Sequence, residues 1–420
     1  MNKQPVAPAW FAYSQQSGKY AIAEDGITNA LLGPSGILGG TVATRPAVPG
    51  EVIVLYATGL GDTDPPYPDG QIIQVPAPLV PPPQVSIGGA PAAVQYAGIT
   101  YAGVYQLNVV VPPLPTGDAA LVLNGGGTLA QGQVFLSILA QPASAVTYKS
   151  IQGVTYTLYP WIGGKVAILT SANTLDVPTM NSILEALDSA YGIYEQITGS
   201  EPSQLPATTL NGRDTIAELP DGNTTCGAGC TYIGATGTEI MTTYFLVLYN
   251  GVLQNGQYDQ ALFYEFGRSF WFYGSQLGKV DAFVTGFAIA NRFVSMDRVP
   301  VNGGPFNGTL PYAQFEKSIV SDLLDAYLAD PQYSWENTLA VGQPYPSSNG
   351  WSAADLAGAM FYRIYSDNGF GAYGRFWKAL ASLPVAGTQD DAIQNFISAA
   401  LSATGRDYGF LFKGKYISEP

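Results

Sequence analysis

The residues best suited to chemistry lie in one short aromatic run, Tyr264-Glu265-Phe266-Gly267-Arg268. Glu265 places a carboxylate in an apolar helical stretch, and Tyr264 and Arg268 stand at i and i+4, which share one face of a helix. When both of those positions are His, this frame binds zinc and the glutamate serves as general base. Here the glutamate is present, but both flanking positions carry other residues.

The chain contains no histidine at all. A histidine-ligated metal, a histidine general base and a Ser-His or Cys-His dyad are therefore excluded by composition. The permanent cation of Arg268 would also repel a divalent metal. We expect Arg268 to form a structural ion pair with Glu265, three residues earlier on the helix, beneath Tyr264 and Trp271. We expect no catalytic residue, no metal and no cofactor at this run.

Carboxylates could work without histidine if two of them lay roughly 5 to 9 Å apart, as in glycosidases. Nothing in the sequence pairs the acidic residues of the helical region. Asp62-Thr-Asp64 and Asp367-Asn368 are too sparse for a calcium loop. The acidic candidates are Glu239, Glu265, Glu316, Asp322, Asp325 and Glu336.

The only two cysteines, Cys226 and Cys230, are separated by three small residues. This spacing lets the chain fold back far enough for a local disulfide, which would form in an oxidising compartment. The alternative is a metal site, but two thiolates without histidine supply too few ligands. So short a loop removes little unfolded-state entropy, so the bridge would serve to fix a turn.

Composition limits the classes of protein that fit. A chain of 420 residues with 47% hydrophobic residues is long enough for two domains. Only 11% of residues are charged, while Tyr (27) and Gly (49) are abundant, which is typical of secreted or assembled proteins. The net charge of −14 argues against nucleic acid or an anionic membrane as partner.

Membrane and targeting segments are not evident in the sequence. No run of about 18 apolar residues is present, so we expect no membrane insertion. The first residues, Met1-Asn-Lys-Gln-Pro5, are not followed by the apolar segment of a signal peptide. This counts only mildly against secretion.

Residues 1–140 predict an all-β sandwich, because short β-rich runs alternate with Gly and Pro clusters. The Pro-rich piece Val75–Pro83 can serve only as an edge, and Asn124–Gly127 predicts a hairpin turn. The predicted strands are Glu51–Tyr56, Gln84–Ile87, Ala93–Tyr96, Val104–Val111, Ala120–Leu123 and Val134–Ile138.

Three motifs in this region resemble an Ig-like module that recurs in large secreted proteins of Acidobacteria. They are Pro49–Gly61, Val85–Gly98 and Gly103–Pro112, in the expected order, and the likeness covers most of residues 8–139. The resemblance implies an extracellular accessory domain without chemistry of its own. In that family the module usually stands at the C-terminal end, whereas here it opens the chain.

A small-residue linker at residues 141–150 precedes a second domain at 151–420. Two short strands, a helix from the N-cap Asp176 to Gly199 and a loop-like stretch at 205–240 come first. The rest is mainly helical, giving an α+β domain. The predicted helices are Met241–Tyr249, Gln260–Tyr273, Ala282–Met296, Phe315–Leu328, Ser352–Asp367, Phe370–Leu380 and Asp390–Thr404.

The order of these elements, with the Glu265 helix at the junction, resembles a zinc metallopeptidase domain of the gluzincin type. By position, Tyr264 and Arg268 stand at the two His ligands and Glu265 at the general base. A third ligand, a Glu from the next helix, is missing from Val284–Arg292. The resemblance therefore implies a catalytically dead, metallopeptidase-like domain.

We expect an extracellular or cell-surface protein with a structural or adhesive role, such as a subunit of a surface layer or filament. It would associate with itself or with other surface proteins and glycans, and the segment Asn2–Tyr20 could add a strand to a neighbour. One alternative is a secreted peptidase or glycan hydrolase that uses Glu265 without His ligands. Another is a non-catalytic module that binds a peptide or glycan in the old cleft.

Overall fold

The chain divides into two compact units. The first comprises residues 1–145, 159–164 and 173–185, and the second comprises 146–158, 165–172 and 186–420. The predicted boundaries, at 140 and 151, stay a prediction, and residues 146–149 of the predicted linker form a strand. The structure is a computed structural model that describes residues 6–13, 19–27, 29–34, 36–38, 42, 44–67, 72–130, 133–223 and 227–416.

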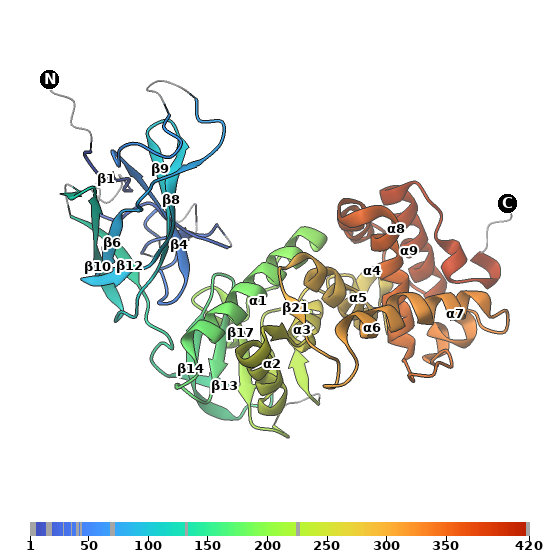
Figure 1. Ribbon diagram of the computed structural model, residues 1–420. Coiled ribbons are helices and arrows are strands. Elements are labelled where there is room, and N and C mark those ends of the chain that lie inside the picture. Colours follow the sequence, from blue (N-terminus) through green and yellow to red (C-terminus); the bar gives the residue numbers. More distant parts are fainter. Residues whose placement is uncertain are drawn as a thin grey trace. The chain divides into compact units, whose positions relative to one another are not determined.

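Two antiparallel sheets build the first unit (Figure 1). The larger has the order β3-β2-β4-β9-β8-β5 with β1 beside β4, and the smaller has the order β11-β10-β6-β7 with β12 beside β10. The strands are β1 (Ala9–Trp10), β2 (Ala23–Asp25), β3 (Leu31–Leu32), β4 (Val52–Thr58), β5 (Ala77–Pro78), β6 (Gln84–Ile87), β7 (Ala90–Ala92), β8 (Val94–Tyr101), β9 (Val104–Val110), β10 (Gly117–Gly125), β11 (Thr128–Leu129) and β12 (Val134–Ile138).

The alternation of apolar and polar residues explains the sandwich. Leu107 and Val109 of β9 and Leu121 and Leu123 of β10 all point into one shared core, because every second residue of a strand faces the same side. The all-β prediction is confirmed, and each of the six predicted strands overlaps an observed one. The Pro-rich piece contributes β5, which lies at the end of its sheet as expected for an edge.

The N-terminal segment was expected to be available to a neighbouring chain, and for its described residues this is wrong. Ala9 and Trp10 pair with Thr58 and Ala57 of β4 in the same chain. Trp10 is 8% exposed and belongs to the core of the sandwich. Burying the indole inside the unit favours intramolecular pairing of this strand.

A buried ion cluster ties together three segments of the first unit. Arg45 forms ion pairs with Asp25 of β2 and with Glu51, which precedes β4. All three residues are less than 9% exposed. Burial raises the pKa of Glu51, and the charge of Arg45 counteracts part of this effect. Glu51 therefore depends on the guanidinium of Arg45 to remain charged inside the protein.

A mixed sheet forms the centre of the second unit, in the order β13-β14-β15-β17-β19-β18 with β16 beside β17. β15 and β17 run parallel and are joined through helix α1, while β18 is an antiparallel strand at one end. The strands are β13 (Val146–Lys149), β14 (Thr155–Ile162), β15 (Val166–Thr170), β16 (Thr209–Leu210), β17 (Arg213–Leu219), β18 (Gly229–Thr231) and β19 (Thr238–Met241).

Helices make up most of the chain after β19, as predicted (Figure 1). Asp176 caps α1 by accepting a hydrogen bond from the Thr179 amide, and Ser352 caps α8. The predicted break between two helices appears as a kink in α8 at Gly369, where φ is 76°. The helices are α1 (Val177–Thr198), α2 (Thr242–Asn255), α3 (Ala261–Ser269), α4 (Gly274–Leu277), α5 (Ala282–Arg298), α6 (Tyr312–Lys317), a π-helical turn (Ser318–Leu323), α7 (Leu324–Ala329), α8 (Ala353–Ala381) and α9 (Gln389–Thr404).

The stretch 205–240 was predicted to be loop-like, and this is wrong. It contains β17, which pairs with β15 on one side and β19 on the other. The strand is hidden in the sequence because its buried face carries Asp214 and Glu218, which are 1% and 3% exposed. Carboxylates are rarely buried, so such a pattern indicates solvent exposure.

Close helix contacts hold α3 against α5. A Cβ atom on Gly267 would lie 2.3 Å from the Cα of Ala288, so only glycine allows this approach. Phe266 of α3 and Phe270, which directly follows the helix, also pack edge-on against Tyr191 of α1. Other aromatic residues of this run are also buried, and they include Phe263, Trp271 and Tyr273.

Within the described residues, none of the helices is both long and apolar enough to span a membrane.

Replacing Arg45 with Leu is expected to destabilise the first unit by about 3–5 kcal/mol, because Asp25 and Glu51 would lose their buried cation. Urea unfolding of the full chain measures the change. Lys19→Leu is the matched control, since its ion pair with Asp118 is solvent-exposed and should matter little. Equal losses in the two variants would show that the buried cluster is not stabilising.

Candidate functional site

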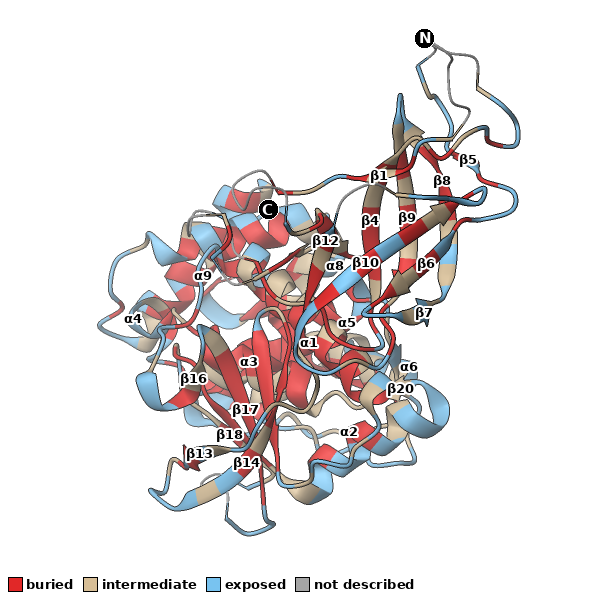
Figure 2. Ribbon diagram, turned by 90° about the vertical axis from the view of Figure 1, so that its left-hand side faces the viewer, coloured by how far each residue is buried: buried red, intermediate tan, exposed pale blue. Residues whose placement is uncertain are grey.

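The run singled out in the sequence forms helix α3, which contacts strand β18 and helix α5. Figure 2 shows that α3, α5 and the neighbouring strand β17 are largely buried. Leu262, Phe263 and Phe266 anchor the helix in the core. Tyr264, Glu265 and Arg268 keep partial exposure, so these three side chains lie at the border of the core.

Glu265 is directed at the edge strand β18. Its Oε2 accepts a hydrogen bond of 2.9 Å from the hydroxyl of Thr231, which lies 3.0 Å from the hydroxyl of Thr238. A Cβ atom on Gly229 would lie 2.7 Å from Glu265 Oε1, so a larger residue there would make the carboxyl shift. Burial raises the pKa of Glu265, while the Thr231 hydrogen bond and the charge of Arg268 lower it.

The expected ion pair between Glu265 and Arg268 is absent from the described residues. Arg268 Nη2 instead donates a hydrogen bond of 2.7 Å to the hydroxyl of Tyr264. The guanidinium carbon lies 5.5 Å from the centre of the Tyr264 ring, within range of a cation–π contact. Arg268 thus turns along the helix toward the residue four positions earlier, whereas Glu265 turns toward the sheet.

A second arginine, Arg292 of α5, reaches the same tyrosine from the opposite helix. Its Nη1 donates a hydrogen bond of 2.8 Å to Gln260 Oε1, and its guanidinium carbon is 5.7 Å from the Tyr264 ring centre. Arg292 is 6% exposed. The segment Val284–Arg292 lacks the carboxylate of a third metal ligand, and its last residue places a cation beside Tyr264 instead.

Three further carboxylates are buried in the sheet, on β17 and β19. Asp214 Oδ1 accepts a hydrogen bond from the amide of Gly237, while its Oδ2 has no partner in the described part of the chain. Burial raises the pKa of Asp214 to about 7. Glu218 accepts bonds from Ser171 and Thr242.

Glu239 accepts bonds from the Tyr148 hydroxyl and the Ile151 amide, at 3.0 and 2.6 Å. Burial raises the pKa of Glu239. Thr238 faces α3, and consecutive residues of a strand face opposite sides, so Glu239 and Glu265 lie on opposite faces of the sheet. They do not form a catalytic pair.

The remaining acidic candidates lie elsewhere. The hydroxyl of Tyr362 is 2.9 Å from Glu316 Oε1 and 3.1 Å from Asp297 Oδ2, which brings those two carboxylates together. Burial and the charge of Asp297 raise the pKa of Glu316 to about 7.

Three acidic candidates are exposed and separate from α3. Asp322 is paired with Lys317, and Glu336 bonds to Ser334. Asp325 is exposed on α7. None of these side chains contributes to a site around Glu265 in the part of the chain that the structure describes.

The predicted disulfide cannot be followed in full, because Cys226 lies outside the described residues. Cys230 is on β18 and is 7% exposed. The pairing of Cys226 with Cys230 therefore stays a prediction.

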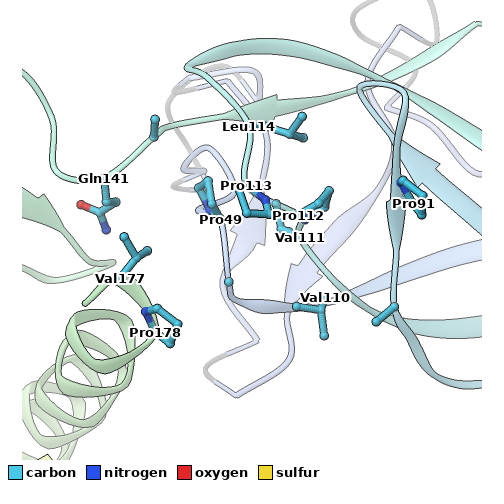
Figure 3. A pocket seen from close by; sticks show the side chains of 13 residues that line it. Pro49, Pro91, Val110, Val111, Pro112, Pro113, Leu114, Gln141, Val177 and Pro178 are labelled. Carbon is cyan, nitrogen blue, oxygen red and sulfur yellow. The ribbon is translucent and has the colours of Figure 1, made fainter. Parts of the chain in front are cut away.

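An apolar hollow of about 440 Å³ lies within the first unit (Figure 3). Pro112, Pro113, Leu114 and Val177 are among its lining residues, and none of the lining residues is ionisable. The one polar side chain, Gln141, is engaged with the backbone of Ile162. The hollow therefore offers shape and apolar surface but no group for chemistry.

A zinc centre does not fit the residues at α3. Tyr264 presents a phenol bonded to Arg268, Arg268 presents a cation, and Arg292 places a second cation nearby. Over the described residues no three acidic or cysteine side chains converge to hold a metal ion. The donor set can bind an anion but not a divalent cation.

Comparison of the chain with protein-family models, with curated proteins and with solved structures gave no match. The resemblances to an Ig-like module and to a gluzincin-type domain rest on the motifs quoted above.

Two residues of the candidate site, Thr231 and Arg292, were not predicted from the sequence. Thr231 lies in the stretch taken for a loop, so nothing marked it as a partner of Glu265. The sequence does mark Arg292 as unusual, because it interrupts an apolar helix and has no acidic residue three or four positions away on either side. The ion-pair partner of a cation at such a position lies on another helix or strand, or the cation remains unpaired.

Replacing Asp214 with Asn is expected to flatten the pH dependence of stability between pH 5 and 8. The folded-state pKa is raised to about 7, so the folded chain holds a proton that the unfolded chain releases near pH 4. Stability from this group is therefore full below pH 4 and falls as the pH rises to 7, by up to about 1.4 kcal/mol per unit.

Urea unfolding at several pH values measures this slope. Asp221→Asn is the control, because hydrogen bonds from Thr243 lower the pKa of Asp221 and keep it charged throughout the window. An unchanged slope in Asp214→Asn would show that this buried carboxyl does not hold the proton.

Proposed function

We propose that this chain is a non-catalytic structural or adhesive protein that works outside the cell. Its first unit would be an Ig-like sandwich and its second an inactive metallopeptidase-like domain. The observation that carries the proposal is the set of contacts at α3: Glu265 is bonded to Thr231, and Tyr264 is bonded to Arg268. These contacts serve the fold, and among the described residues they leave no ligand set for a metal and no second carboxylate beside Glu265 for acid–base work.

The element order of the second unit supports the metallopeptidase-like part of the proposal. A mixed sheet with an antiparallel end strand precedes two packed helices, α3 and α5, and the Glu265 helix lies against that end strand. The sandwich of the first unit supports the Ig-like part. The scarcity of charge, at 11% of residues, supports an exterior, assembled state.

Helix α2 supports the proposed association with other molecules. The helix has 14 residues, none of them charged, and it buries Phe245, Leu248 and Tyr249 against the second unit. Its outer face remains apolar: Tyr244, Leu246, Val247 and Leu253 are 42%, 38%, 50% and 47% exposed. Contiguous exposed apolar side chains mark interaction surfaces. Copies of this chain or other surface proteins would cover this face.

Zinc binding and peptide cleavage test the proposal that the chain is not catalytic. After incubation with zinc and dialysis, the full chain is expected to retain well under about 0.1 zinc per molecule, because two cations surround Tyr264. It is also expected to leave unstructured peptides uncut. Elemental analysis and mass spectrometry of the peptides give the readouts. Stoichiometric zinc, or cleavage that stops in Glu265→Gln but continues in Glu336→Gln, would establish an enzyme instead.

Replacing Val247 with Lys is expected to weaken self-association of the full chain at least about tenfold, because the charge would be desolvated in the contact. Light scattering over a range of protein concentrations gives the particle mass. Val385→Lys, at a residue that is 75% exposed and lies outside α2, is the matched control. If the unsubstituted chain is monomeric at every concentration, the assembly proposal fails.

A further inference from the structure

Two guanidinium groups approach Tyr264 without a carboxylate partner. In the described part of the chain, no ion pair within 4.0 Å involves Arg268 or Arg292. Arg268 is partly exposed and bonds to the Tyr264 hydroxyl, whereas Arg292 is 6% exposed. Charged side chains that are this deeply buried are normally paired, so an unmet charge lies at this position.

Arg292 is protonated and carries its positive charge at neutral pH. Burial lowers the pKa of Arg292 to about 10, and the charge of Asp355 opposes part of that shift. Asp355 is already bonded to the amide and hydroxyl of Ser352 at the start of α8. Asp259, the other carboxylate within electrostatic range, accepts a bond from the Ala261 amide. Neither one approaches Arg292 as an ion-pair partner.

Unmet hydrogen-bond donors gather around the same arginine. Three buried donors have no hydrogen-bond partner among the described residues: the Nε of Arg292, the hydroxyl of Tyr312 and the indole N–H of Trp351. The Arg292 guanidinium lies 4.5 Å from the Phe293 ring centre and 4.7 Å from that of Phe315.

These groups all belong to one aromatic cluster. The Tyr312 ring lies 6.2 Å from Phe293, and the Trp351 ring lies 5.8 Å from Phe315. All three unmet groups can donate, and buried donors left unpaired are unfavourable. The molecule that would satisfy them is an acceptor.

We propose that Tyr264, Arg268 and Arg292 form a binding site for a carboxylate carried on an apolar body, as at the C-terminus of a peptide. The guanidinium forks match the planar, two-oxygen geometry of a carboxylate. The partly exposed rings of Tyr264, Tyr312 and Trp351 supply apolar surface for the attached side chain. Tyr264 and Arg268 form the entrance, and Arg292 contributes charge from beneath.

The site depends on one part of the proposed function, the absence of a catalytic metal at α3, and it is independent of self-association. It assigns the three residues a shared role that neither a zinc centre nor a packed core gives them. A purely structural role for Arg292, in which its ring contacts alone compensate for burial, is the competing explanation. Ligand binding separates the two explanations, because ring stacking within the core predicts no affinity for a carboxylate.

Calorimetric titration of the full, EDTA-treated chain tests the site with N-acetyl-L-phenylalanine. Its dissociation constant is expected on the order of 1 mM, and the uncharged amide of the same compound should bind at least about tenfold more weakly. Arg268→Gln should weaken binding of the acid by about the same factor. Arg298→Gln is the matched control on α5, since Arg298 is exposed and stacks on Phe370, and it should bind as the unsubstituted chain does.

Arg268→Gln is the decisive variant, because Arg268 is partly exposed and its loss leaves the core intact. Arg292→Gln is a second variant, and circular dichroism checks that it folds. Absence of binding, equal binding of the amide, or unchanged binding in Arg268→Gln would overturn the site while leaving the proposed function standing. Equal binding of glucuronate or of sulfate would overturn the peptide carboxylate as the ligand. Binding that requires added zinc would overturn the site and the non-catalytic proposal together.

Discussion

The hydrogen bond from Thr231 to Glu265 joins α3 to the end strand of its sheet, and the arrangement of the candidate site depends on it. The bond turns the carboxyl toward β18, where Gly229 leaves room for it. A carboxyl held there is turned away from Arg268, which bonds instead to Tyr264. The direction of the Glu265 side chain thus separates its carboxyl from the guanidinium of Arg268 on the same helix. The Arg268 cation is therefore available to other groups.

Much of the fold could be predicted from local patterns, because those patterns arise from local physics. Alternation locates β6 at Gln84–Ile87 and β12 at Val134–Ile138 to the residue, since the unit has one interior face per strand. Ser352 and Asp176 mark helix starts because an unpaired helix amide needs a side-chain acceptor. These signals depend on a few neighbouring residues and require no knowledge of the partner element.

The candidate site was harder to predict because its contacts join distant residues. The spacing of Glu265 and Arg268 allowed an ion pair, but Thr231, 34 positions away, offered the carboxyl a partner on the sheet. The missed strand β17 has the same origin: its acids are compensated by Gly237, Ser171 and Thr242, and none of these is near it in sequence. Sequence patterns report the polarity of a residue, whereas burial of a polar residue is decided by its partners.

Several of the few charged residues of this chain are buried, and their balance affects what helix α3 can bind. The first unit balances its buried cation with two carboxylates around Arg45, so its cluster is complete without a ligand. Among the described residues of the second unit, Arg292 has no carboxylate partner, and its guanidinium contacts Gln260 and aromatic rings instead. Neutral groups and aromatic rings stabilise a buried cation less strongly than a carboxylate would. This difference in stabilisation increases as water is excluded. A metal centre needs electron-rich ligands around a cation, whereas two guanidinium groups need an anion between them. The phenol of Tyr264 and the guanidinium of Arg268, together with the guanidinium of Arg292, therefore give this helix surroundings that favour an anion over a metal ion.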